Sequence, residues 1–319
     1  MLRDTPLFAE SWNIAFRKKP IGEILSDIQT PFCVIKNSFR YWAADPFVIE
    51  WEGRTYIFAE LYDYILRRGI LGYCTINGDK AGKWKPIIKE PYHLSYPCIT
   101  GFNGKLCLMP ESGAGKVLAI YEAVAFPDNW ENRRVLRGDV QFADTTPLPH
   151  ADRKLALTHR VDDPENPQLL LIDMDGQQAD VPVMGKVALR SRPAGHVFEK
   201  DGQWFRPAQV SADTGTGYGK GLVFCRCKID DALRYSEEEI KEIRPEDLKY
   251  NKAIYLDGMH TYNASEHYEV IDIKTRRFNV LNFVMRVVGK LLPAKRKPYD
   301  RRFWYSLCYY QDGEIVKYN

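Results

Sequence analysis

The feature that most constrains the fold of this chain is a hairpin pattern that returns about every 50 residues. Its first copy spans 45–60, where an apolar run, a turn at Glu52-Gly53 and a second aromatic and β-branched run indicate two paired strands. Further copies lie at 96–111, 145–159, 194–209 and, after a longer insertion, 259–272. A period of roughly 40–50 residues with about four strands per unit is typical of β-propeller blades. The sequence therefore predicts an all-β, five-bladed β-propeller.

The same repeat predicts one domain over 1–319, since all-β domains routinely exceed about 200 residues. The blades are expected at about 32–90, 91–138, 139–189, 190–257 and 258–319. A propeller must close its ring, and a strand at 11–17 is expected to do so by joining the last blade. A further strand at 303–310 and a hairpin at Asp312-Gly313 are expected to finish that blade.

Polar residues recur at the ends of these hairpins. In a hairpin the start of the first strand lies beside the end of the second, so innermost hairpins would carry these residues around the channel mouth. The alternative for each residue is that it only satisfies backbone groups beside a turn. The residues are Asp45 with Glu60, Tyr96 with Glu111, Asp144 with His159, Arg192 and His196 with Gln209, and His260.

Composition excludes several classes of function. The chain is 45% apolar and 27% charged, and a net charge of +3 is too small to predict nucleic-acid binding. Seven cysteines without a second pair at ligand spacing indicate reduced thiols in a cytoplasmic protein. We see no signal peptide and no apolar run of about 18 residues. The motifs at 173–175 and 214–220 are too short or wrongly spaced for metal or phosphate binding, so no metal or cofactor is expected.

The segment 276–302 differs in composition from the rest of the chain. It contains nine Lys and Arg residues and a single acidic residue, Asp300. Within it an apolar stripe at helical spacing predicts an amphipathic helix over 279–298. Such a helix can lie on an anionic membrane or pack against the propeller with its charges in water. The stripe consists of Leu281, Val284, Met285, Val288, Leu291 and Leu292.

Ala44-Asp45-Pro46, followed by an apolar strand and Glu52-Gly53, resembles the first-blade signature of the five-bladed propeller glycosidases, the arabinanases and xylosidases. This resemblance implies that Asp45 is the base or nucleophile and that Asp144 tunes the pKa of the acid. The Glu-Gly-Pro of that clan falls where this chain has 192–196, and an arginine there is no general acid. Glu111 could replace the missing acid if burial raises its pKa.

A fuller resemblance covers roughly 10–275. These motifs, in this order, resemble the N-terminal domain of plant glucosamine inositolphosphorylceramide transferases and its stand-alone bacterial relatives. Those relatives are associated with surface-glycan assembly, and in the plant proteins sugar transfer is ascribed to a separate C-terminal domain. The motifs include Ala44-Asp45-Pro46, His93-Leu94-Ser95-Tyr96-Pro97, Pro110-Glu111-Ser112, Arg192-Pro193-Ala194-Gly195, Arg206-Pro207-Ala208-Gln209, Tyr218-Gly219 and Gly258-Met259-His260-Thr261.

We therefore expect glycosyl transfer from an activated, nucleotide-type sugar donor to a glycan or glycolipid acceptor in surface polysaccharide or glycolipid biosynthesis. Asp45, Glu111 and Asp144 are the expected catalytic carboxylates. The alternatives are a glycoside hydrolase with a relocated acid and a non-catalytic glycan-binding propeller. The protein would be cytoplasmic, and peripheral at the inner membrane if its helix binds lipid. Expected substrate-binding residues are Glu60, His93, Tyr96, His159, Arg192, His196, Arg206, Gln209, Tyr218 and His260.

Overall fold

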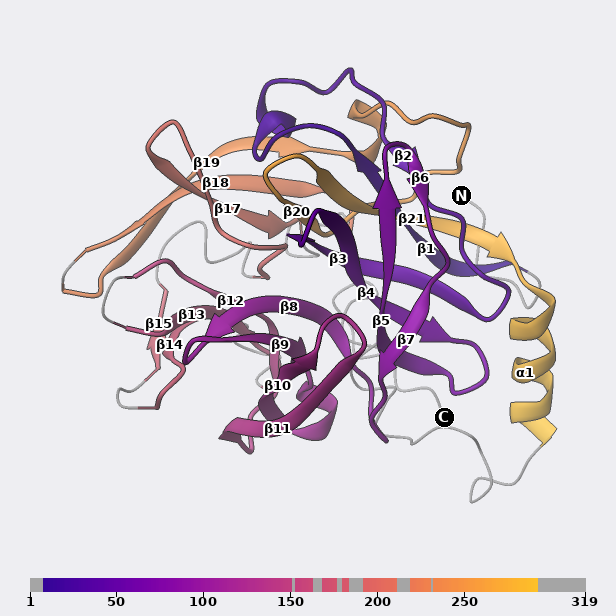
Figure 1. Cartoon of the computed structure of the whole chain (residues 1–319), viewed down its shortest axis with the longest axis horizontal. Helices are drawn as coiled ribbons and strands as arrows, with labels where there is room; N and C mark the ends of the chain where they lie inside the picture. The colour runs from indigo at the N-terminus through magenta and orange to yellow at the C-terminus, as the bar shows by residue number, and fades with distance from the viewer. Residues whose placement is uncertain are drawn as a thin grey trace.

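The chain forms a five-bladed β-propeller, as the sequence predicts (Figure 1). This computed structural model describes residues 8–150, 153–162, 168–176, 180–183, 192–210, 219–230 and 232–291. Every strand pair within these residues is antiparallel, and consecutive strands pair throughout in three of the five sheets. Tyr218 and the expected elements at 303–313 lie outside the described residues.

The first four blades follow the chain. Blade one contains β3 (Tyr41–Trp51), β4 (Arg54–Asp63), β5 (Arg68–Asn77), β6 (Lys80–Ala81) and β7 (Lys85–Ile88). Blade two contains β8 (Ser95–Phe102), β9 (Lys105–Glu111), β10 (Val117–Ala125) and β11 (Asn129–Gly138). Blade three contains β12 (Phe142–Pro147), β13 (Leu155–Arg160), β14 (Gln168–Asp173) and β15 (Val181–Pro182). Blade four contains β16 (Phe198–Lys200), β17 (Gln203–Gln209), β18 (Leu222–Ile229) and β19 (Tyr235–Ile243).

The fifth blade combines distant parts of the chain. It contains β20 (Tyr262–Ala264), β21 (Glu269–Phe278), β1 (Phe8–Arg17) and β2 (Cys33–Val34). Strand β1 pairs with β21 along its whole length. Strand β2, which falls in the span 32–90 that the sequence assigns to the first blade, instead pairs with β1. The N-terminal strand thus lies between the nearby β2 and the distant β21, more than 200 residues along the chain, and its pairing with β21 closes the ring of blades.

Local sequence explains why the innermost hairpins form. Tight turns at Glu52-Gly53, Asn103-Gly104 and Asp201-Gly202 have positive φ at both residues, the geometry whose twist matches that of paired strands. The apolar middles of these hairpins are buried, and Phe58 and Met109 have no exposed surface. Truncating such a residue to alanine costs about 2–5 kcal/mol of stability. Short 3-10 turns at η1 (Glu23–Leu25), η2 (Gly113–Gly115) and η5 (Pro245–Asp247) lie in the connections.

One α-helix, α1 (Val280–Leu291), follows β21 and stands at the edge of the propeller (Figure 1). Asn279 caps it, because its side-chain oxygen accepts a hydrogen bond from the backbone N–H of Asn282 at 2.9 Å. Leu281 packs with the buried aromatic residues Trp12, Trp42 and Tyr64. The part of the predicted helix beyond Leu291 lies outside the described residues. Among the described residues no helix is long and apolar enough to span a membrane.

Candidate active site

Three innermost strands share a bulge at the same place. Asp45, Tyr96 and Asp144 have φ values of 51°, 46° and 53°, which are unusual for residues other than glycine. At each of them the strand register shifts within β3, β8 or β12. A β-bulge redirects a side chain, and such backbone strain costs about 1–3 kcal/mol each unless the surroundings stabilise it. The repeated bulge therefore marks the inner strand ends as a place where side-chain direction matters.

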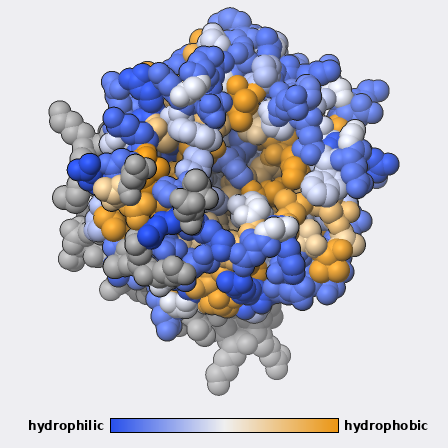
Figure 2. Space-filling model, turned by 60° about the vertical axis from the view of Figure 1, so that its left-hand side comes forward, coloured by the Kyte–Doolittle hydropathy of each residue, from blue (hydrophilic) through white to orange (hydrophobic). Residues whose placement is uncertain are grey.

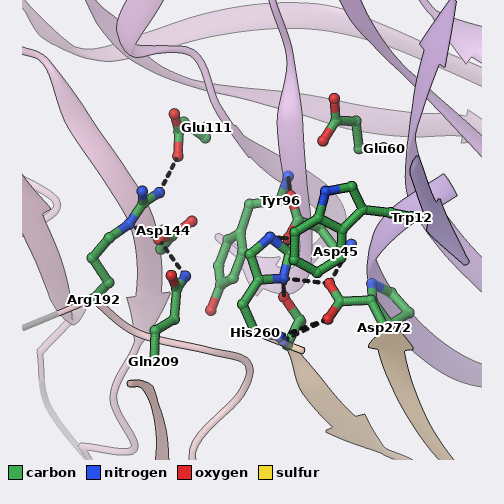
Figure 3. Close-up of polar contacts among 12 residues, drawn as sticks. Trp12, Asp45, Glu60, Tyr96, Glu111, Asp144, Arg192, Gln209, His260 and Asp272 are labelled. Atoms are coloured by element: carbon green, nitrogen blue, oxygen red, sulfur yellow. Dashed lines mark hydrogen bonds and ion pairs between the residues drawn. The ribbon is translucent and has the colours of Figure 1, made fainter. Parts of the chain in front are cut away.

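The second strands of the hairpins end beside these bulges. Glu60, Glu111 and His159 pair with the residue just before each bulge. Gln209 ends β17 in blade four, and Asp272 lies within β21 of blade five, where its N–H donates to Thr261. Figure 3 shows side chains from all five blades turned toward one space. Figure 2 shows a hollow in one face of the molecule, with hydrophilic residues in its depth and hydrophobic ones along one side. We call the following set the ring: Asp45, Glu60, Glu111, Asp144, Arg192, Gln209, His260 and Asp272.

Two hydrogen bonds fix the Asp45 carboxylate in the ring. Its Oδ2 accepts the backbone N–H of Tyr96 at 3.1 Å, and its Oδ1 accepts the hydroxyl of Thr261 at 2.9 Å. His260 Nε2 lies 3.7 Å from Oδ1. Burial raises the pKa of Asp45 to about 6, although His260 opposes the rise. At pH 7 this carboxyl group is therefore mainly ionised and can accept a proton or attack an electrophile.

His260 completes this side of the ring with two residues that the sequence did not single out for the site. Its Nδ1 lies 2.5 Å from Asp272 Oδ2, and its ring stacks on Trp12 with centroids 4.0 Å apart. Asp272 Oδ1 also accepts the backbone N–H groups of His260 and Thr261 at 2.8 and 3.0 Å. Burial alone disfavours a charged imidazole, but Asp272 and Asp45 raise the pKa of His260 above its ordinary value.

The opposite side of the ring contains Glu111, Asp144 and Arg192. Arg192 Nε donates to Asp144 Oδ2 at 2.6 Å, and its Nη2 donates to Glu111 Oε2 at 3.4 Å. Gln209 also donates to Asp144 Oδ2, at 3.0 Å. Burial and the charge of Asp144 raise the pKa of Glu111 to about 8, although Arg192 opposes the rise. Glu111 is therefore mainly protonated at pH 7 and can donate that proton.

Glu60 is a further buried carboxyl group. Within the described part of the chain its Oε1 has no hydrogen-bond partner, and it lies 3.5 Å from His93 Nε2 (Figure 3 shows the Glu60 side chain). Burial, with the charges of Asp45 and Glu111, raises the pKa of Glu60 well above its usual range. Burial lowers the pKa of His93 to about 3, so this imidazole is neutral and its Nδ1 accepts the N–H of Gly69 at 2.9 Å.

Other predicted binding residues hold the scaffold together. The Tyr96 hydroxyl accepts the Gly195 N–H at 2.7 Å and lies 2.7 Å from the hydroxyl of Thr146, which ties three blades. His196 packs edge-on against Phe47 at 5.0 Å, and burial lowers the pKa of His196 to about 4. His159 is buried, and burial lowers its pKa to about 3. These side chains shape the wall of the ring.

Arg206, which the sequence predicts to bind substrate, does not join the ring. Its guanidinium is fully buried and makes two 2.6 Å hydrogen bonds to Glu237 in β19. Arg206 lies three residues before Gln209 on β17, and residues at odd spacing point to opposite faces of a strand. The pair is therefore a buried structural contact, because moving Arg206 toward a ligand would leave Glu237 buried without its charge partner.

Asp45, His260 and Asp272 also form a group that could hold a cation. Among the described residues their ligand atoms lie within 4.8 Å of one another, and all three residues are buried. Two carboxylates and an imidazole would suit a divalent metal ion. In this structure the same atoms already satisfy each other and Thr261 through hydrogen bonds.

The chain is similar to known carbohydrate-active proteins in both sequence and fold. Residues 26–153 match the family described as "Glucosamine inositolphosphorylceramide transferase 1, N-terminal". The protein of that name from Arabidopsis thaliana is 26% identical over 250 residues, covering 74% of this chain and 31% of the relative. Its counterpart from Oryza sativa subsp. japonica is 22% identical over 244 residues, covering 72% of this chain and 31% of the relative. The chain thus spans about a third of the length of these relatives.

Solved structures confirm the resemblance to furanosidase-like propellers. The catalytic domain of Coprinopsis cinerea GH62 alpha-L-arabinofuranosidase aligns with a TM-score of 0.53 at 12% identity, covering 82% of this chain and 98% of that domain. A GH62 hydrolase in complex with xylotriose aligns with a TM-score of 0.51 at 11% identity, covering 72% of this chain and 81% of the hydrolase. At these identities the likeness shows the fold.

Proposed function

We propose that this chain is a carbohydrate-active enzyme that makes or breaks a glycosidic bond at the ring. The observation that carries the proposal is the placement of Asp45 and Glu111, which reach the same space from adjacent blades (Figure 3). Their partners differ in kind. Backbone N–H and hydroxyl donors hold Asp45, whereas Glu111 lies beside the Arg192–Asp144 pair. Two carboxyl groups held in different protonation states are what glycosidic chemistry requires.

Glu111 would act as the general acid and give its proton to the leaving oxygen as the glycosidic bond breaks. Asp45 would act in its ionised form, either attacking the anomeric carbon or taking the proton of the attacking hydroxyl or water. Asp144 and Arg192 would act as positioning residues, since they lie against Glu111 and set its pKa. Over one full catalytic cycle, Glu111 gives one proton to the leaving group and the ring takes one proton from the attacking hydroxyl or water, so the number of protons in the ring is unchanged.

The charge of the ring supports a neutral sugar as its substrate. The ring has five carboxyl groups against two basic residues, Arg192 and His260, and the pKa values of Glu60 and Glu111 among the five are raised. Arg192 already donates to two of those carboxyl groups, and Arg206 is paired with Glu237. A donor with two phosphates would meet unfavourable charge here. Transfer from a nucleotide sugar is the second candidate, and similarity to the named transferases is the observation that favours it.

The test uses aryl glycosides and nucleotide sugars with the native chain and two variants. Release of the aryl group supports chemistry at the glycosidic bond, and release of nucleotide supports the second candidate. Glu111→Gln should slow cleavage about 10²–10⁴-fold for poor leaving groups and far less for dinitrophenolate, which needs no proton. Asp45→Asn should slow both substrates alike.

The matched control is Glu122→Gln, because Glu122 pairs with Lys105 on the outside of blade two. It should leave both rates unchanged. Binding of oligosaccharides without turnover of any substrate would instead identify a non-catalytic glycan-binding propeller and overturn the proposal.

A further inference from the structure

Exposed apolar side chains gather around the start of helix α1. Phe39 is 62% exposed, Phe278 45%, Val280 49%, Val284 46% and Val287 42%. Large apolar residues exposed singly are ordinary on a protein surface, whereas a contiguous group of them marks an interaction site. These five residues, here called the α1 surface, come from two regions of the chain that are more than 200 residues apart in sequence.

The geometry of the helix makes the α1 surface continuous. Val280, Val284 and Val287 are spaced four and three residues apart, so they share one face of α1. Asn279 Nδ2 donates to the backbone carbonyl of Phe39 at 3.0 Å, which brings that exposed ring to the helix start. Figure 1 shows α1 at the outer edge of the propeller.

The α1 surface is distinct from the face that attaches the helix to the propeller. Leu281 makes that attachment by packing with Trp12, Trp42 and Tyr64. Val280, Val284 and Val287 lie on another side of the helix, and all three are exposed. Attachment of α1 therefore does not require the valines, and the helix has two apolar faces of which one meets solvent.

The charged residues in the segment 276–288, which includes most of α1, are all arginines. Arg277 precedes the helix and Arg286 lies within it. Over 276–302 the sequence contains nine Lys and Arg residues against one acid, Asp300. An exposed apolar stripe beside clustered bases is the combination that binds the interface of an anionic membrane. An apolar surface beside these arginines would repel a basic partner and gain little from a neutral one.

We propose that the α1 surface docks this protein onto an anionic lipid membrane. The valines and the two phenylalanines enter the headgroup region, and the bases lie at the level of the lipid phosphates. Leu281 shares a cluster with Trp12, and Trp12 stacks on His260 of the ring, so docking holds the ring close to the membrane.

Cosedimentation of the full chain with vesicles tests the docking without reference to catalysis. Vesicles of phosphatidylcholine alone are compared with vesicles containing phosphatidylglycerol at low and high salt. The native chain should bind the anionic vesicles, and added salt should weaken binding because the Debye length shortens to about 8 Å at physiological ionic strength. Arg286→Gln should weaken binding about fivefold, the factor that corresponds to one base near such a surface.

The variant V284D/V287D should reduce binding more than Arg286→Gln, while V124D/V135D is the matched control. Val124 and Val135 are also exposed valines, on β10 and β11 of blade two, and should leave binding unchanged. Thermal melts establish that each variant is folded. Equal binding of V284D/V287D and the native chain, or equal binding to neutral and anionic vesicles, overturns the proposal. A dimer in light scattering that V284D/V287D abolishes also overturns it, in favour of a second copy as occupant.

Turnover separates the docking from the proposed function. If the chain cleaves soluble aryl glycosides yet ignores anionic vesicles, the docking proposal fails alone. If it binds the vesicles but turns over no sugar substrate, the proposed function fails alone. Faster turnover of a lipid-borne glycoside in anionic than in neutral vesicles, lost in V284D/V287D, is the result expected when both hold.

Discussion

On each side of the ring one basic residue lies between two carboxyl groups, but the basic residue differs. On one side Asp45 and Asp272 share His260, which stacks on Trp12. On the other side Glu111 and Asp144 share Arg192. Arginine stays charged at every physiological pH, whereas histidine changes its charge near neutrality. On the Arg192 side the charge of the arginine stays constant while Glu111 donates its proton. On the His260 side the charge of the imidazole can change with pH and with bound substrate.

The largest difference between the sides should appear in their Asp→Asn variants. Asp45→Asn removes the proposed base or nucleophile, so we expect a loss of about 10²–10⁴-fold in kcat at pH 7, where native Asp45 is mainly ionised. Asp144→Asn removes a charge that raises the pKa of Glu111, so the alkaline limb of the pH profile should move to lower pH. Initial rates from pH 5 to pH 9 measure both effects. A uniform loss in Asp144→Asn, with the limb unmoved, would contradict the positioning role.

In the native enzyme the same pair predicts a bell-shaped profile. Activity should fall below about pH 6 as Asp45 becomes protonated, and above about pH 8 as Glu111 loses its proton. Glu111→Gln should remove the alkaline limb and leave the acid limb in place. An alkaline limb that persists in Glu111→Gln would assign the acid to another group, of which Glu60 is the nearest candidate by burial and raised pKa.

The free energy of unfolding should also depend on pH through Asp45 and Glu111, with a smaller effect than on kcat. The pKa values of Asp45 and Glu111 in the folded protein lie above those of an unfolded chain, near 4. The folded state thus holds protons that the unfolded chain has released, and this stabilisation is fully present below about pH 4. It is lost as pH rises through about 6 for Asp45 and about 8 for Glu111. Between pH 6 and 9 we expect a loss of about 1–3 kcal/mol.

Urea unfolding at several pH values measures this slope, because the denaturation midpoint reports stability when the transition is two-state. Glu111→Gln should flatten the slope on its alkaline side, whereas Glu122→Gln should leave it as in the native chain. The Arg192 side and the His260 side can thus be distinguished by where along the pH axis the stability changes.

The hairpin repeat predicted much of this arrangement because its signals are local. Turn residues such as Glu52-Gly53 and the apolar strand middles define each blade, and hairpin geometry then brings Asp45 beside Glu60. Arg206 was misplaced because sequence proximity to Gln209 does not reveal which face of a strand a residue occupies. Glu111, an ordinary strand-end residue in sequence, has a raised pKa because burial and Asp144 act on it, and that depends on packing between blades.

Asp272 and Trp12 were missed for a different reason. The fifth blade combines β1 with β21, so the contact between Trp12 and His260 joins residues about 250 positions apart that no local pattern relates. The one available signal was an Asp inside the otherwise apolar strand Val270-Ile271-Asp272-Ile273. A charged residue in a buried strand needs a partner, and here the backbone of His260 and its imidazole supply it.

The smallest predicted effect concerns Trp12, which is 2% exposed and therefore no platform for a sugar. Its ring instead stacks on His260, a contact worth about 1 kcal/mol when the imidazole is charged. Trp12→Phe should lower the pKa of His260 slightly and change kcat/KM about two- to fivefold, with kcat near the native value. An imidazole titration by NMR with steady-state kinetics measures both. If kcat falls as far as in Asp45→Asn while the pKa of His260 is unmoved, Trp12 acts on the Arg192 side as well, and the two sides are not separate units.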